Sequence, residues 1–468
     1  MSPPSTIPQR ALGMFEKNQL AKQLTKGYAS VTMTAVLHHP PRSTSSALFY
    51  KRYLYSALSP MIQTHPMLRL SVSDVDQPSV HFVQLTSLRL DDLVSVTDQD
   101  AFWDLATQER IITEQCDHEF DLYTKTPLWH LRVSCHPDRL DQCSVTLSLQ
   151  HVIADGLSTT IIWRDLLEHL NNVSLDESED ETAPLLVFDT SDPCHIPLPI
   201  EDRHGPKDPS ISPSDPMPVD GWQGDSPAPE NEKLDTVLHL VKVKSQPWAN
   251  LVKAAKTKGV SMHAVLYAAY LLSWLAEYPD QAVKSVSAIN CRPYCQPPIP
   301  ADELGIFFGR YELGWPLEKL ALYSSSNSTD TFWKLAQDYH ALIQNNKLLT
   351  CQRSLLMGDA LPNYPDDYCD VWYGARRNFR MGRSGGLNIS DLGRFSYTVG
   401  GAWTLDELWF AQSAHTYATI LAVNVITANG TMHAAITWQR GSVQEEKALR
   451  FIDSFVSRLE KEAFLGLE

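Results

Sequence analysis

An acidic, proline-rich segment in the middle of the chain constrains the fold more than any other feature. Residues 173–232 contain fifteen acidic and two basic residues, which accounts for −13 of the chain's net charge of −16. Such a segment cannot bury enough apolar surface to form a core, so we expect a solvated crossover linker. Because the chain has 468 residues and domains commonly hold about 100 to 200, the sequence predicts an N-terminal lobe at 1–172 and a C-terminal lobe at 233–468.

Both flanking segments combine the residue patterns of strands and helices. Apolar residues that alternate with polar ones predict strands, and apolar residues three and four apart predict helices. The expected strands are 28–38, 68–74, 80–85, 128–136, 143–151, 234–243, 283–290, 305–313, 386–390, 416–426 and 432–438. The expected helices are 14–24, 45–64, 101–116, 157–170, 247–257, 262–278, 331–349 and 443–462. The predicted fold class is therefore α+β, with a hairpin turn at Asn429-Gly430 between the last two strands.

Composition excludes several classes of protein. Hydrophobic residues make up 43% and charged residues 20% of the chain, as in ordinary soluble proteins. No apolar run reaches the roughly 18 residues of a membrane span, and the first ten residues lack a signal pattern, so we expect a soluble cytoplasmic monomer. Nucleic acid is not an expected partner, because no stripe of basic residues is present. The eight cysteines lack paired Cys-x-x-Cys spacing, which argues for reduced thiols and against a metal site.

The segment Gln150–Gly156 sets one histidine at the end of an apolar strand. Asp155 and Gly156 supply turn chemistry, one through a locally bonding carboxylate and the other through its freedom to take positive φ. A helical pattern resumes directly afterwards. Burial lowers the pKa of an imidazole from about 6.5, so His151 could be neutral and accept a proton from a hydroxyl. A structural core histidine before an ordinary turn fits these residues equally well.

Four further segments carry groups that suit a site. Asn290-Cys291-Arg292-Pro293 ends a strand, and Arg292 could pair with Asp155 or remain solvated. In Leu304–Gly309, glycines permit a close approach to the backbone, although a bulge is the preferred interpretation of these residues alone.

One of the other two segments offers a hydrogen-bond donor and the other an aromatic ring. Leu387–Gly393 places the Ser390 hydroxyl at a strand end, where it could donate to an oxyanion or belong to a common turn. Asp406–Ser413 contains Trp409, which could line a pocket or belong to the core.

Read together, these segments resemble a family. His-x-x-x-Asp-Gly at 151–156, Asn-x-Arg-Pro at 290–293, Leu-Gly-x-x-x-Gly at 304–309 and Ser-x-Leu-Gly at 390–393 follow the order found in fungal alcohol O-acetyltransferases. These enzymes are part of the acyltransferase superfamily of chloramphenicol acetyltransferase, plant BAHD enzymes and the condensation domains of nonribosomal peptide synthetases. The resemblance spans residues 15 to 460 and both predicted lobes.

The resemblance implies a pseudodimer of two lobes with a central tunnel. Acetyl-CoA, or another acyl-CoA, would be the co-substrate, and the hydroxyl of a small natural product would be the acceptor. His151 would act as general base in a direct transfer without an acyl-enzyme. Asp155 would turn away from the tunnel and pair with Arg292, beside Asn290 and Gly156, and Ser390 or a nearby backbone amide would stabilise the oxyanion.

Two positions depart from the pattern of the superfamily. Gln150 stands where many members carry a first histidine, and Asp391 stands where these acetyltransferases often carry asparagine. The plant BAHD Asp-Phe-Gly-Trp-Gly signature is absent, which favours the fungal branch. Open alternatives are N-acyl transfer, a carrier-protein donor, or a binding or scaffold protein of the same fold without acyl transfer.

A cluster of arginines stands apart from these motifs. Arg376, Arg377, Arg380 and Arg383 lie close together in a chain that is otherwise acidic. Guanidinium groups match phosphate oxygens, so the cluster is a candidate for binding CoA phosphates, with a solvated loop as the alternative. The other histidines are expected to be core or surface residues, including His38, His39, His263 and His415.

Overall fold

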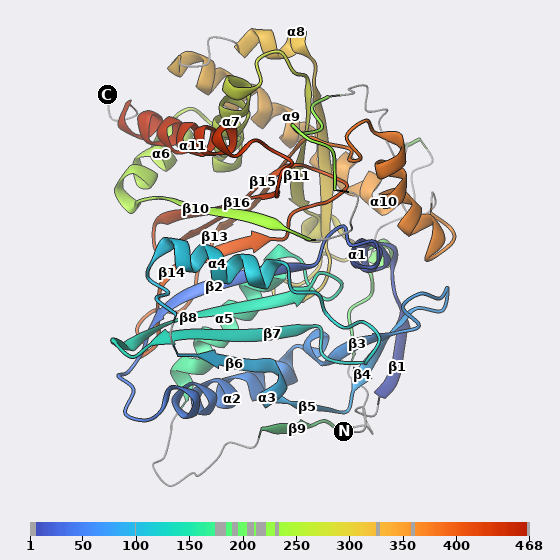
Figure 1. The fold of residues 1–468 in the computed structure, drawn as a ribbon, viewed down its shortest axis with the longest axis vertical. Helices are drawn as coiled ribbons and strands as arrows, with labels where there is room; N and C mark the ends of the chain where they lie inside the picture. The colour runs from blue at the N-terminus through green and yellow to red at the C-terminus, as the bar shows by residue number, and fades with distance from the viewer. Residues whose placement is uncertain are drawn as a thin grey trace.

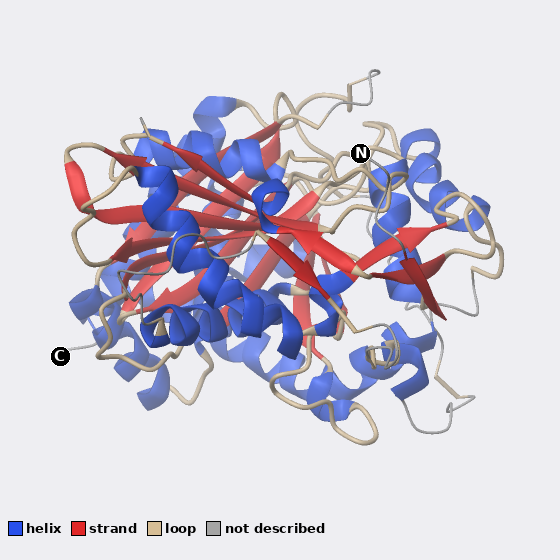
Figure 2. Cartoon of the chain, turned by 90° about the horizontal axis from the view of Figure 1, so that it is seen from below, coloured by secondary structure: helices blue, strands red, loops and turns tan. Residues whose placement is uncertain are grey.

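The computed structural model describes residues 6–98, 100–173, 184–189, 195–203, 210–211, 221–229, 234–323, 328–356 and 361–465. The described residues form two lobes, each built around a mixed sheet with helices packed on it (Figure 1). Strands occupy the middle of the molecule and helices lie around them (Figure 2). The predicted α+β class with two lobes is therefore confirmed.

The first lobe is built on a five-stranded sheet in the order β14-β2-β8-β7-β6. Its strands are β14 (Thr404–Gln412), β2 (Ser30–His38), β8 (Arg139–Gln150), β7 (Trp129–His136) and β6 (Val94–Thr97). Helices α2 (Ser46–Thr64) and α5 (Gly156–Asn172) pack against each other on this sheet. The apolar alternation of β8 thus ends at residue 150, and His151 lies in the turn that leads into α5.

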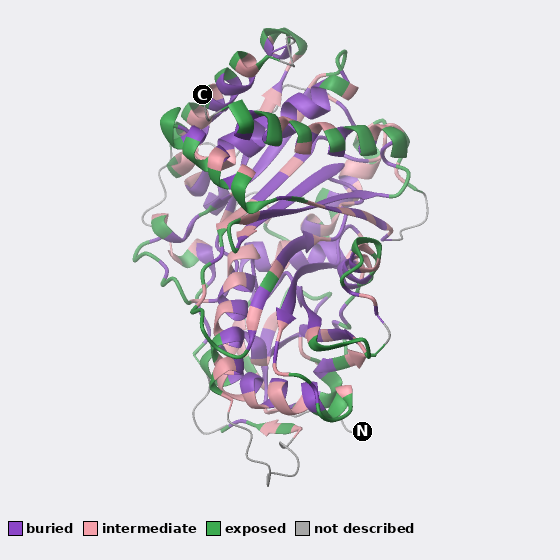
Figure 3. Ribbon diagram, turned by 90° about the vertical axis from the view of Figure 1, so that its left-hand side faces the viewer, coloured by how far each residue is buried: buried purple, intermediate pink, exposed green. Residues whose placement is uncertain are grey.

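The second lobe is built on a six-stranded sheet in the order β10-β16-β15-β13-β11-β12. Its strands are β10 (Thr236–Val243), β16 (Thr431–Gln439), β15 (Leu421–Ala428), β13 (Leu387–Arg394), β11 (Val283–Asn290) and β12 (Phe308–Trp315). Its covering helices are α6 (Ser245–Thr257), α7 (Met262–Glu277), α9 (Thr329–Leu356) and α11 (Glu445–Leu465). Both sheets are buried, whereas the outer faces of the helices are exposed (Figure 3).

One strand from the second half of the chain completes the sheet of the first lobe. β14 pairs with β2 in antiparallel register, so that Trp409 lies opposite Thr34 and Gln412 opposite Val31. Helix α4 (Leu105–Cys116) also joins the lobes, because it contacts both β2 and β10. The chain therefore crosses between the lobes a second time, after the crossover at 173–232.

The described parts of the crossover contact both lobes. β9 (Leu185–Val187) pairs with β5 (Ser87–Arg89) near the first lobe. Trp222 is buried in the second lobe, where its ring lies 5.8 Å from that of Trp274. The acidic run 176–181 lies outside the described residues. The predicted boundaries of the linker stay a prediction.

The remaining elements are short or lie at the junction of the lobes. A three-stranded sheet has the order β1-β4-β3. These elements are β1 (Thr6–Ala11), β3 (Leu70–Ser73), β4 (His81–Leu85), α1 (Met14–Leu24), α3 (Leu90–Leu93), α8 (Leu317–Leu320) and α10 (Asp366–Asn378). Among the described helices, none is by itself long and apolar enough to cross a membrane.

Three expectations about local structure meet different outcomes. The hairpin turn between β15 and β16 is confirmed, with Asn429 and Gly430 both at positive φ. The strand expected at 416–426 begins only at Leu421. No helix was expected at α10 and no strand at β14, because the apolar spacing of each is broken by charged residues that face solvent.

Candidate active site

A cavity of about 340 Å³ lies between the two lobes. His151, Asp155 and Leu157 line it from the first lobe, and Val286 and Asn388 line it from the second. An open groove of about 970 Å³ adjoins it beside α10. Cavity and groove share the lining residues Arg310, Trp372 and Ala418, so the two spaces are neighbours.

His151 lies in this cavity as a buried imidazole. The side chain packs between the rings of Tyr28 and Phe308, at centroid distances of 5.9 and 5.6 Å. Its Nδ1 atom is buried and has no hydrogen-bond partner of ordinary geometry among the described residues. Burial and the nearby Lys22 ammonium lower the pKa of His151 to about 4, and the Asp155 carboxylate only partly opposes this shift. The imidazole is therefore neutral at pH 7 and able to accept a proton.

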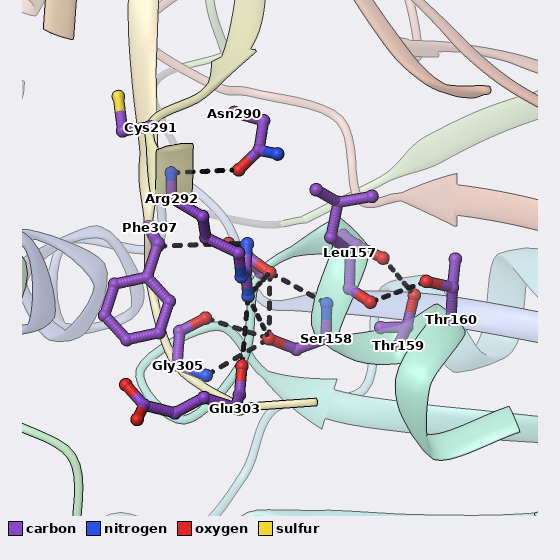
Figure 4. A network of polar contacts seen from close by, with 12 residues as sticks. Leu157, Ser158, Thr159, Thr160, Asn290, Cys291, Arg292, Glu303, Gly305 and Phe307 are labelled. Atoms are coloured by element: carbon purple, nitrogen blue, oxygen red, sulfur yellow. Dashed lines mark hydrogen bonds and ion pairs between the residues drawn. The ribbon is translucent and has the colours of Figure 1, made fainter. Parts of the chain in front are cut away.

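Asp155 forms a buried ion pair with Arg292. Arg292 donates from Nη1 to Asp155 Oδ2 at 2.7 Å and from Nη2 to Oδ1 at 3.0 Å (Figure 4). The backbone N–H of Phe307 donates to Oδ2 at 3.0 Å, and that of Ser158 donates to Oδ1 at 2.8 Å. Burial raises the pKa of Asp155, but these donors outweigh it and hold the pKa below the usual range.

This ion pair ties the first lobe to the second. Asp155 is the N-cap of α5, while Arg292 follows β11 and Phe307 precedes β12. Ser158 adds a second link, since its hydroxyl donates to the carbonyl of Gly305 at 3.0 Å. The structure thus brings together the predicted pair Asp155 and Arg292, with the carboxylate fully occupied and unable to carry protons.

Gly156 is required for space and not for its backbone angle. No positive φ occurs at this residue, in contrast to the expectation from the sequence. A Cβ placed there would lie 2.7 Å from Leu392 Cδ2 and 3.1 Å from Phe410 Cζ. A side chain at Gly156 would therefore require Leu392 on β13 and Phe410 on β14 to shift.

Gln150 replaces a histidine of related enzymes and has a structural role here. Its side chain accepts from the backbone N–H of Val152 and donates to Gln23 Oε1 at 3.2 Å. The residue is buried. Gln150 thus holds the turn that carries His151.

Asn290, Ser390 and Asp391 all line the cavity. Asn290 Oδ1 accepts from the backbone N–H of Arg292 at 3.1 Å, which shapes the turn after β11. Ser390 Oγ accepts from Gln412 Nε2 at 3.3 Å, so its own hydroxyl proton can point into the cavity. Asp391 Oδ2 lies 3.5 Å from Nδ1 of His263, which offers a partner for the carboxylate that departs from the family pattern.

Trp409 is a correction to the sequence analysis, because it does not line the cavity formed by the described residues. The indole is buried and contacts the His433 ring at 4.7 Å, and its N–H donates to Glu407. Successive side chains of a strand point to opposite faces. Phe410 and Gln412, on the other face of β14, line the cavity instead.

The members of the arginine cluster are not among the described residues that line the cavity or the groove, and their binding of CoA phosphates stays a prediction. Arg376 donates to the carbonyl of Pro229 and Arg377 pairs with Asp370. Arg383 is buried and donates to the carbonyl of Ser226 at 2.7 Å. Arg380 is exposed near the end of α10. Helix α10 presents Trp372 to the cavity, and its arginines face elsewhere.

The sequence analysis missed several residues of the cavity. Lys22 on α1 and Arg310 on β12 line it, as does His415, which was expected to be a core or surface residue. The His415 ring stacks on Tyr28 at 4.9 Å. Burial and nearby cations hold the pKa of His415 well below its usual range. Only tertiary structure brings α1 and the segment after β14 together, so no local pattern indicated these residues.

Comparisons with known proteins agree with this architecture. The chain is 22% identical to the probable alcohol acetyltransferase FCK4 of Fusarium pseudograminearum, over 93% of this chain and 92% of that protein. The TRI3 trichothecene 15-O-acetyltransferase of Fusarium sporotrichioides has a similar structure, with a TM-score of 0.70 and 11% identity over 98% of this chain and 96% of that one. Polyketide synthase associated protein 5 of Mycobacterium tuberculosis follows with a TM-score of 0.61 and 15% identity over 98% and 99%.

Solved condensation domains share the fold as well. The first condensation domain of the CDA synthetase gives a TM-score of 0.61 at 12% identity, over 98% of this chain and 96% of that one. At these identities the likeness shows the fold alone, which is the two-lobed fold predicted from the sequence.

The family of the chain follows from a match over its second half. The description of that family is alcohol acetyltransferase, and its model matches residues 227–463, half of the chain. Membership implies an alcohol as acceptor and acetyl-CoA as co-substrate. The chain therefore belongs to the alcohol acetyltransferase family and is an acyltransferase enzyme.

Proposed function

We propose that this enzyme transfers the acetyl group of acetyl-CoA to a hydroxyl of a small natural product, with His151 as the general base. The observation that carries the proposal is the buried, neutral imidazole in a cavity between the lobes, with a carboxylate beside it that is already paired. A base of this kind accepts a proton during attack and returns it afterwards.

The proposed reaction has two steps and no acyl-enzyme. The acceptor oxygen attacks the thioester carbonyl carbon while its proton moves to the His151 imidazole. The tetrahedral intermediate then collapses, the carbon–sulfur bond breaks, and the imidazolium returns the proton to the thiolate of CoA. Asp155 and Arg292 hold the loop that carries the base, and the cavity with its adjoining groove offers room for both substrates.

The reaction is tested by incubating the enzyme with acetyl-CoA and a panel of hydroxylated natural products. Release of free CoA together with an acetyl mass shift on an alcohol is the expected result. Parallel reactions test the two alternatives. Matched amines replace the alcohol as acceptor, and an acetylated carrier protein replaces acetyl-CoA as donor. Exclusive acetylation of the amine, or transfer from the carrier alone, would contradict the proposal.

Ser390 is the proposed donor to the oxyanion of the tetrahedral intermediate. Replacement by alanine removes its hydroxyl, and a lost donor of this kind lowers kcat by about 100-fold or more. The KM for acetyl-CoA should change little, since the interaction forms in the transition state. Ser354→Ala serves as the control, because Ser354 lines the same cavity from α9. An equal effect of both substitutions on kcat would argue against this role.

The pKa of His151 predicts how activity depends on pH. The neutral imidazole is the active form, and the pKa is lowered to about 4, so turnover of an uncharged alcohol should be constant between about pH 5 and 8. Activity should fall only as the pH decreases through the pKa and the imidazole becomes protonated. Initial rates measured alongside tryptophan fluorescence separate this loss from acid unfolding. If activity instead decreased with a pKa near that of a solvated imidazole, about 6.5, the base would be exposed to solvent.

A further inference from the structure

Lys22 is a buried cation in the cavity that the proposed reaction does not use. The residue lies on α1, is 8% exposed and lines the cavity. Its Nζ donates to Gln19 Oε1 at 2.9 Å. Among the described residues, no carboxylate lies within ion-pair distance of this ammonium. A buried charge without a counter-ion is unfavourable unless a ligand supplies one.

The surroundings of Lys22 form a preorganised pocket for a negative group. The Nζ atom lies 5.1 Å from the ring centroid of Tyr28 and 5.5 Å from that of Trp372, and these electron-rich faces partly stabilise it. Of the cavity-lining carboxylates, Asp155 is paired with Arg292, and Asp391 faces His263. Burial, with the nearby guanidinium of Arg310, lowers the pKa of Lys22 to about 7, so the amine is only partly charged at pH 7 and a bound carboxylate would favour its charged form. Neither carboxylate is therefore placed to neutralise this ammonium.

We propose that Lys22 determines specificity by binding an acidic group, such as a carboxylate, on the acceptor alcohol. The inference rests on the proposed function and names the chemical class of its substrate. A carboxylate that meets the ammonium between Tyr28 and Trp372 gains charge-assisted hydrogen bonds in a buried site.

Geometry favours the acceptor over the CoA phosphates as the source of the negative charge. Lys22 Nζ and the His151 ring lie 5.1 and 5.9 Å from the centroid of the same Tyr28 ring, so the amine and the proposed base face one cavity. In acetyl-CoA, the pantetheine arm separates the phosphates from the thioester. This arm is a chain of several amide and methylene groups and is longer than the width of the Tyr28 ring.

Binding of two matched probes tests the proposal without requiring turnover. The acidic probe is 4-(hydroxymethyl)benzoate, and its neutral counterpart of similar size is 4-(hydroxymethyl)benzamide. Calorimetric titration of the wild-type enzyme should show tighter binding of the acid. Lys22→Met should weaken the acid by about 10- to 100-fold and leave the amide unchanged, whereas Lys22→Arg should retain the preference. Lys17→Met is the matched control, because Lys17 lies on α1 outside the cavity lining.

Several outcomes would overturn the proposal. These are equal affinity of the wild type for both probes, no binding of the acid, or an equal loss of both in Lys22→Met. A weaker affinity for CoA in Lys22→Met, with the preference for the acid intact, would assign the ammonium to the donor instead. If the acid binds as expected but no alcohol of the natural-product panel is acetylated, the binding proposal holds and the proposed reaction fails, so the two are distinguishable.

Discussion

Replacing His151 with alanine is expected to lower kcat for acetyl transfer by about 10²- to 10⁴-fold, the usual contribution of a general base. The cavity would lose the imidazole that the turn after β8 holds in place and that accepts the hydroxyl proton. Affinity for acetyl-CoA should change little, because the effect concerns proton transfer. Initial rates of ester formation and a separate titration with acetyl-CoA measure the two quantities.

A second histidine of the cavity provides the control for this substitution. His415 stacks on Tyr28 and lines the same space, so His415→Ala removes an imidazole of equal size. Its effect on kcat should be much smaller than that of His151→Ala. Comparable losses in the two variants, both folded, would show that shape and not proton transfer explains the role of His151.

Replacing Asp155 with alanine is expected to reduce the free energy of unfolding by about 3–5 kcal/mol. The substitution leaves the Arg292 guanidinium buried without its carboxylate and removes the N-cap of α5. Catalysis should fall as well, since the turn that carries His151 loses its tie to the second lobe. Urea unfolding followed by tryptophan fluorescence measures the stability.

Another N-cap on the same chain separates the two causes of that instability. Asp104 caps α4 on the surface, where its carboxylate accepts from the backbone N–H of Thr107. Asp104→Ala should cost only about 1 kcal/mol. The double variant Asp155→Ala with Arg292→Met should recover part of the stability but not the activity, because no unpaired charge remains buried. A loss in Asp155→Ala no larger than in Asp104→Ala would contradict the importance of the ion pair.

Local patterns were sufficient to predict most strands of the two central sheets, but not the order of those strands. β8 could be predicted because its side chains alternate up to residue 150, and the β15–β16 hairpin because Asn-Gly favours its turn. β14 was not expected as a strand because Asp406 and Glu407 interrupt its alternation at a bulge. Because β14 was not expected as a strand, its alternate residues were not assigned to opposite faces of a sheet. This explains why Trp409 was expected to line the cavity.

The site was only partly accessible from the sequence. Asp155 and Arg292 were paired through the family resemblance, and the structure supplies the distances that join them across the lobes. The arginine cluster was chosen for its local charge, yet charge in sequence does not fix the direction of side chains on α10. No pattern in the sequence indicated that Lys22 lines the cavity, because its surroundings depend on the contact between α1 and α10. Long-range packing therefore decides which charges reach the substrate.

Chemical rescue of His151→Gly tests the central claim most directly. The substitution leaves a space of the size of an imidazole between Tyr28 and Phe308. The measurement is the initial rate of ester formation at increasing concentrations of added imidazole. We expect a variant with little activity alone whose rate rises with the concentration of neutral imidazole and then saturates. Ester formation at near the wild-type rate without added imidazole would contradict the assignment of His151 as the general base.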